Sequence, residues 1–277
     1  MQGLMMHCGA EQIEHSALMQ LPSPVRTDTH VPIPHFELYK MAESQLLEQG
    51  YSITQPKHYI DAKAARYFSL MQILHEDEES KDGYSTLCAL RNSHDKTFSA
   101  SLAIGAKVFV CDNLSFSGDI VVGRKHTQNI MDELPGLLEG AIGRIRVMRK
   151  RQEIRFAEYK EAPLDDMTVD HLIMETYREG IINLTRIGKV NGEWHDPSAD
   201  HGDKSVWRYF NAVTAALGPA STNQLIQLPK KTIKLHLLLD KYCDVDLPSE
   251  ELLQEVTTSA QPGVGTTIKG VFKRILN

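Results

Sequence analysis

Several features that would assign this chain to a class at once are scarce or missing. Its 277 residues include only four cysteines, which lie far apart and form no CxxC pair: Cys8, Cys88, Cys111 and Cys243. That spacing argues against a zinc ribbon and is typical of reduced thiols in a cytosolic compartment. No apolar run approaches the ~20 residues that a membrane-spanning helix needs, so no membrane contact is predicted.

Other absences narrow the possible functions. The N-terminal stretch MQGLMMHCGAEQ has neither a basic segment nor a long apolar core, so we expect no secretory signal and a cytoplasmic location. The phosphate-binding patterns GxGxxG and GxxxxGK[ST] do not occur, and no cofactor is predicted. A formal net charge of −6 and a pI near 6.1 lack the basic excess of a nonspecific DNA coat. A net negative charge does not exclude a local basic groove.

What is present predicts one main domain with two extensions. A chain of this length fits one large domain or two small ones. Prolines are frequent between residues 22 and 34, which predicts an extended N-terminal arm over residues 1–40. The main domain is expected over 41–245. Residues 246–277 are expected to form a flexible tail with a short amphipathic end.

The most informative segment spans residues 84–118. Apolar side chains there alternate at the period of two that is typical of a strand with one buried face: Phe98, Ala100, Leu102 and Ile104. We predict three antiparallel strands, with Gly105-Ala106 turning the chain into a third strand that ends at Cys111.

Helical periodicity dominates the chain after this meander. One long helix is predicted over 127–159, and Pro135 either kinks it or marks its first turn. Shorter helices are predicted at 38–50, 164–180, 205–217 and 231–243. Asp203 or Ser205 is expected to be the N-cap of the helix at 205–217. The segment 57–74 is predicted to be extended structure, helix or both, and 189–204 a polar loop. The expected fold is α+β, with an antiparallel meander packed against the long helix and further C-terminal helices.

The turn Asn92-Ser93-His94-Asp95 carries an amide, a hydroxyl, an imidazole and a carboxylate in consecutive positions. Neighbours along a strand point to opposite faces, so adjacency alone cannot make them a catalytic triad. Asn92 and Asp95 are equally suited to bonding backbone amides and holding the turn. Two interpretations stay open, a structural turn and a site, and in the second His94 could act with Cys111 or with Asp95.

A basic cluster on the predicted long helix is the strongest charge feature. Arg144, Arg151 and Arg155 fall at the edge of its apolar stripe, where the helix would meet the sheet. Guanidinium groups placed there should pair with a carboxylate or hold a phosphate. Together with Asn92, Ser93, His94 and Asp95, these arginines are the predicted nucleic-acid-binding residues.

Two other polar segments are weaker candidates. His195 and His201 lie in a loop rich in carboxylates, but their spacing matches no standard ligand pattern, so no metal site is predicted and their role stays open. The acidic run Glu76–Glu79 could contact a protein that normally binds DNA. The oligomeric state is not predicted.

Three strings of residues resemble one family. LRNSHD (90–95), VFVCDNL (108–114) and VWRYFNAVT (206–214) are similar, in this order, to segments of the phage- and plasmid-borne family called domain of unknown function 932. The similarity covers roughly residues 60–220 and departs at Lys96, where glycine is usual, and at Asp112. It implies a mobile genetic element and action in the cytoplasm of a bacterium, but no reaction.

Three functions follow as hypotheses. The first is a phage or plasmid accessory protein of DNA metabolism that contacts nucleic acid through a local basic groove. The second is a protein-binding inhibitor of a host defence or replication enzyme, as in host takeover by a bacteriophage. The third is an enzyme that uses His94 with Cys111 or Asp95. We expect a binding protein rather than an enzyme.

Overall fold

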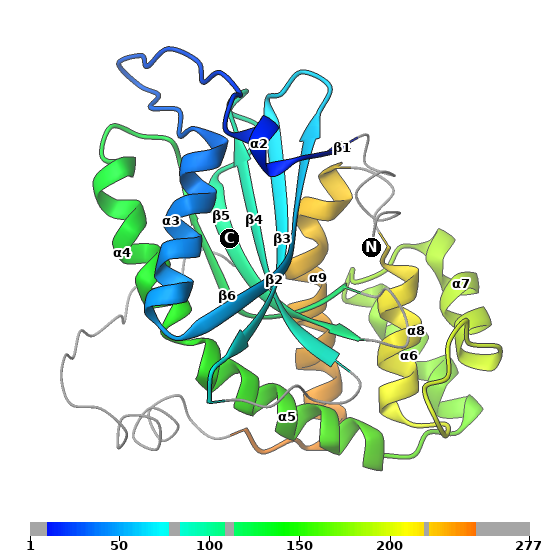
Figure 1. Cartoon of the computed structure of the whole chain (residues 1–277). Coiled ribbons are helices and arrows are strands. Elements are labelled where there is room, and N and C mark those ends of the chain that lie inside the picture. The colour runs from blue at the N-terminus through cyan, green and yellow to red at the C-terminus, as the bar shows by residue number, and fades with distance from the viewer. Residues whose placement is uncertain (1–9, 78–83, 109–113, 219–221, 248–277) are drawn as a thin grey trace.

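The computed structural model describes residues 10–77, 84–108, 114–218 and 222–247 (Figure 1). Its centre is one antiparallel sheet of six strands that pair in chain order. The strands are β1 (Ala10–Ile13), β2 (Tyr51–Asp61), β3 (Arg66–His75), β4 (Tyr84–Ser93), β5 (Ala100–Val108) and β6 (Leu114–Arg124). With the helices described below, this confirms the α+β class and the antiparallel meander.

The sheet is larger than the predicted three strands. The segment 57–74 contributes to β2 and β3, and residues after Cys111 form β6, an edge strand. Within the predicted arm, β1 pairs with β2 from Ala10 opposite Asp61 to Ile13 opposite His58. The arm therefore adds the other edge strand, and this contact between distant segments has no local sequence pattern.

The predicted turn at Gly105-Ala106 is wrong. β5 continues through both residues, and Gly105 lies opposite Leu87 of β4. On the other side, the pairing of β5 with β6 shifts register between Ile104 and Ala106. Glycine inside a strand often marks such an irregularity instead of a turn. The predicted strand end at Cys111 lies outside the described residues.

The helices surround this sheet. They are α2 (His15–Leu18), α3 (His35–Glu48), α4 (Ile130–Ile142), α5 (Ile145–Glu161), α6 (Asp166–Arg178), α7 (Leu184–His195), α8 (Val206–Ala216) and α9 (Thr222–Cys243). The single helix predicted over 127–159 is wrong, because α4 ends at a C-cap on Gly143 and α5 starts anew at Ile145. Pro135 lies inside α4. The break falls where glycines have lowered helix propensity most.

The predicted loop over 189–204 is also wrong in its first half, which belongs to α7. Val190 and Trp194 are both fully buried, one helical turn apart, and outweigh the turn signal of Asn191-Gly192. The predicted N-cap is confirmed at Ser205, whose hydroxyl accepts a hydrogen bond from the backbone N–H of Arg208 at 3.5 Å.

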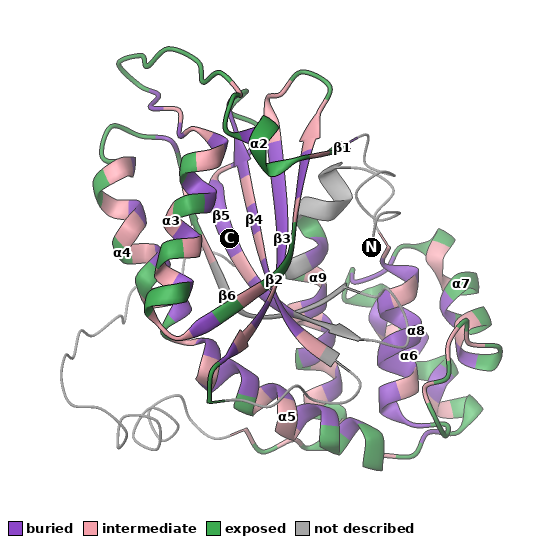
Figure 2. Ribbon diagram, viewed as in Figure 1, coloured by how far each residue is buried: buried purple, intermediate pink, exposed green. Residues whose placement is uncertain are grey.

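Two apolar cores lie on opposite faces of the sheet (Figure 2). On one face Met71, Cys88 and Leu102 pack with α3 and α4. On the other face Phe68 and Leu87 pack with α6 to α9. α5 joins the two layers, because residues at its start belong to the first core and residues towards its end to the second. In the described part of the chain, no helix combines the length and apolarity that crossing a bilayer requires.

Candidate nucleic-acid interface

Asn92 is the centre of a buried hydrogen-bond network. It is fully buried at the end of β4, and its Nδ2 donates to the carbonyl oxygen of Ile33 at 2.7 Å and to Nδ1 of His35 at 3.0 Å. Its Oδ1 accepts a hydrogen bond from Nε2 of His126 at 2.7 Å. Every hydrogen-bonding group of the amide is thus directed at the N-terminal arm, α3 or the segment after β6.

The side chains of Ser93 and His94 also form hydrogen bonds within the fold. The Ser93 hydroxyl donates to the carbonyl oxygen of Phe98 at 2.8 Å and accepts from the Phe98 backbone N–H at 3.1 Å, which closes the turn. His94 donates from Nε2 to the carbonyl oxygen of Ile33 at 2.8 Å, and its ring stacks on His35 at 3.9 Å between centroids. Both side chains are buried and are occupied by contacts within the fold.

Asp95 is the exposed member of the turn. Its Oδ2 pairs with Nε of Arg66 at 2.7 Å, and its Oδ1 accepts from the backbone N–H of Thr97 at 3.1 Å. Partial burial opposes its charged form, but the hydrogen bonds from Thr97 and Arg66 outweigh burial and lower the pKa of the carboxyl. Lys96, which follows, has a φ of +64°, a conformation that favours glycine. The tight left-handed turn is therefore kept without a glycine.

Histidines gather around this network as neutral bases. Burial, more than any other cause, lowers the pKa of His35, His58 and His126 to about 4. In each case a neighbouring imidazole adds to the effect. His58 lies with its Nδ1 at 2.9 Å from the Tyr67 hydroxyl, and its Nε2 is 3.3 Å from Nδ1 of His15 in α2. Neutral imidazoles here fasten the N-terminal arm to the sheet.

The predicted arginines have a different environment. Arg155 is buried in α5 and forms a two-point ion pair with Asp240 of α9, at 2.7 and 2.8 Å. The Tyr159 hydroxyl donates to the same carboxylate at 2.7 Å. Arg155 therefore joins two helices. Arg144 occupies the N-cap position of α5 and Arg151 its second turn, and both are half-buried.

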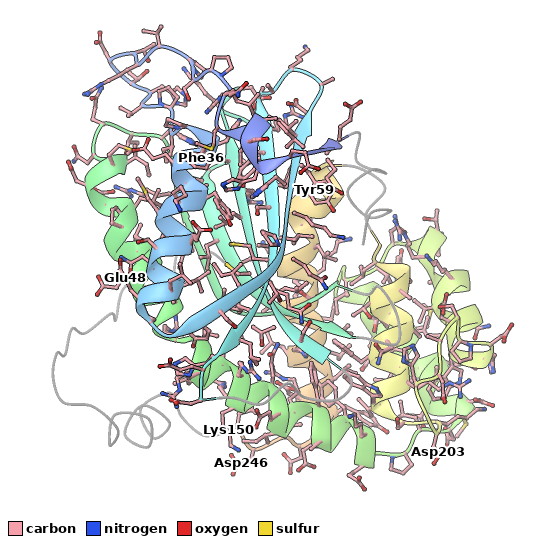
Figure 3. The ribbon with its side chains drawn as sticks, viewed as in Figure 1. Phe36, Glu48, Tyr59, Lys150, Asp203 and Asp246 are labelled. Carbon is pink, nitrogen blue, oxygen red and sulfur yellow. The ribbon has the colours of Figure 1, made fainter. Side chains whose placement is uncertain are left out.

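The turn and the arginines lie at opposite ends of the sheet. Ser93 pairs with Arg66 at the start of β3, whereas Arg146 of α5 reaches Asp77 just after the end of β3, at 3.8 Å. A strand of 10 residues is about 30 Å long. In Figure 3, Lys150 of α5 lies low in the molecule, and Phe36, next to His35, lies at the top. The two groups of residues do not form one groove.

The other candidate residues of the sequence analysis are Cys111, His195, His201 and the acidic run Glu76–Glu79. Cys111 lies outside the described residues, so a pair with His94 has no structural description. His195 ends α7 as an exposed residue and His201 is half-buried beyond it. Across the described ranges, no three histidine, cysteine, aspartate or glutamate side chains gather as metal ligands. The acidic run lies partly beyond residue 77, where the described segment ends.

A lysine ridge on α9 is the surface that the sequence analysis missed. Lys230, Lys234 and Lys241 fall within ~40° of one another at ~100° per residue, and Leu237, 63% exposed, lies between them. We call these four residues the α9 ridge. The single acidic residue of this helix is Asp240, which is held by Arg155. Lys234 donates to a backbone carbonyl, that of Glu179, at 2.7 Å.

A second pair of cations strengthens one flank of the α9 ridge. Burial and the guanidinium of Arg186 lower the pKa of Lys231. Arg186 donates to the carbonyl oxygens of Ala216 and Gly218 at the end of α8, the latter at 3.1 Å. The i, i+4, i+11 spacing of the ridge lysines could have predicted this surface from the sequence. The arginines of α5 are closer together in the sequence and were therefore the stronger candidates.

Comparisons with known proteins add no assignment: no family model, no curated protein and no solved structure matched the chain. The resemblance to the domain of unknown function 932 family stays a prediction.

Proposed function

We propose that this chain is a phage- or plasmid-borne accessory protein of DNA metabolism that binds nucleic acid through the α9 ridge, in the cytoplasm of a bacterium. The observation that carries the proposal is a helix of 22 residues that presents three lysines on one face and whose one carboxylate is committed to Arg155. Lysine side chains attract phosphates, and counterion release makes such binding favourable at low salt.

The dimensions of the ridge suit a nucleic-acid backbone. From Lys230 to Lys241 the helix rises about 16 Å. That length corresponds to roughly five nucleotides at 3.4 Å per nucleotide along one strand. Tyr242, 44% exposed beside Lys241, adds an aromatic surface on which an unpaired base can stack. We therefore expect stronger binding to single strands than to duplex.

The test is fluorescence anisotropy with a labelled single-stranded oligonucleotide over a range of salt concentrations. Lys230→Glu with Lys234→Glu should abolish binding, and the single neutral variant Lys230→Gln should lower the slope of log affinity against log salt by about one. Lys63→Glu, at an exposed position between β2 and β3, is the matched control and should bind normally. Tyr242→Ala should remove the preference for single strands.

Two results would overturn the proposal. One is the absence of binding by the unmodified protein at low salt, where electrostatic attraction is greatest. The other is unchanged binding by the double variant. Arg151→Glu tests the groove predicted on α5 in the same assay, because binding lost in that variant alone would move the interface from α9 to α5.

A further inference from the structure

A second cationic group lies on the sheet itself, away from α9. Phe68, Arg91, Ser101 and Gly123 stand opposite one another on β3, β4, β5 and β6, so they form one row across the sheet. Side chains in one row share a face, here the face that Phe68 shares with α6 to α9. β6 is an edge strand and Gly123 is exposed. The row is therefore exposed at Gly123, whereas Ser101, the next member, is buried.

Arg91 is half-buried in this row, and no carboxylate of the described residues pairs with it. Its Nε donates to the Ser101 hydroxyl oxygen at 2.6 Å, and its guanidinium lies 5.5 Å from the centre of the Phe98 ring. Arg66 and Arg155 have carboxylate partners, Asp95 and Asp240. Within the described ranges, the polar and aromatic interactions of the Arg91 guanidinium are the hydrogen bond to the Ser101 hydroxyl and the contact with the Phe98 ring. Burial lowers the pKa of its guanidinium.

Such a charge is expensive inside a protein unless an anion compensates it. The contact through Nε leaves the two Nη atoms of Arg91 to form a fork of the kind that binds phosphate oxygens at two points. Ser101 uses a lone pair to accept from Arg91, so its own hydroxyl proton can be donated to a ligand. A Cβ at position 123 would lie 3.2 Å from the Cβ of Ser101. Glycine at that position keeps the approach to both groups clear.

We propose that Arg91, Ser101 and the open backbone at Gly123 form a binding site for a phosphate monoester or inorganic phosphate. The anion enters over β6, takes two hydrogen bonds from the guanidinium of Arg91 and one from the Ser101 hydroxyl. This site does not depend on the α9 ridge, which is built from other elements and serves a phosphodiester backbone.

Inorganic phosphate is the probe, added to the full chain at constant ionic strength. The unmodified protein should show a saturable rise in Tm, and Arg91→Met should show none. Because Arg91→Met removes an uncompensated charge, its Tm without phosphate should equal or exceed that of the unmodified protein. Arg91→Lys should bind phosphate about tenfold more weakly, since a lysine cannot form the fork. Gly123→Ala should also lose the response.

Two controls separate this site from general salt effects and from the ridge. Arg178→Met removes an exposed arginine at the end of α6 and should keep the full response to phosphate. The α9 double variant, Lys230→Glu with Lys234→Glu, should also keep it. An equal rise in Tm in Arg91→Met and the unmodified protein would overturn the proposal, as would the absence of any rise. Loss of oligonucleotide binding in Arg91→Met with an intact response to phosphate would also overturn it.

Discussion

The polar network around Asn92 should be a major source of stability, and Asn92→Ala tests it. The substitution removes three hydrogen bonds of a fully buried amide. The carbonyl oxygen of Ile33 keeps its bond from His94, but His35 and His126 each lose a partner. An unsatisfied buried group costs ~1–3 kcal/mol, so we expect a loss of about 3–5 kcal/mol in the free energy of unfolding. This is a large fraction of the ~5–15 kcal/mol typical of a domain.

Urea denaturation followed by circular dichroism measures this loss directly. Asn191→Ala, at an exposed position of α7, is the matched control and should change stability by less than about 0.5 kcal/mol. In Asn92→Ala, limited proteolysis should cut the arm around Ile33 before the rest of the chain, because the arm loses its main attachment. A loss below about 1 kcal/mol would refute the reasoning, since the network would then be dispensable.

Three other predictions follow from the same region and from α5. The pKa of His35, His58 and His126 is about 4 in the folded protein and about 6.5 in the unfolded chain, so the unfolded chain binds more protons between these two pH values. The free energy of unfolding should therefore fall as the pH decreases from 6.5 to 4, by up to about 1.4 kcal/mol per pH unit for each histidine. Urea midpoints that stay constant from pH 7 to 5 would contradict this. Lys96→Gly should stabilise by ~0.5–1 kcal/mol because φ is +64°, whereas Lys96→Ala should not, which thermal unfolding of both variants can check. Arg155→Ala should lower the free energy of unfolding by about 3–5 kcal/mol, because the carboxylate of Asp240 loses its cationic partner. An unchanged urea midpoint would show that this ion pair does not stabilise the fold.

The sequence by itself determined the local elements. Period-two alternation located β4 and most of β5, and helical spacing with flanking glycines located α6 and α8. Alternation along a strand also excluded a triad of adjacent residues in the Asn92–Asp95 turn. These inferences succeed because they depend on contacts between residues that are close in the chain.

Tertiary structure alone decided what those side chains touch. The partners of Asn92 are 34 to 59 residues away in the chain, and the carboxylate that holds Arg155 is 85 residues away. No local spacing encodes such pairs, because they arise when the arm closes over one end of the sheet and α9 packs beside α5. Packing likewise turned Asp240 towards Arg155 and left Lys230 and Lys241 of α9 exposed. It thereby moved the candidate interface from the arginine-rich helix to a helix whose charges looked ordinary in sequence.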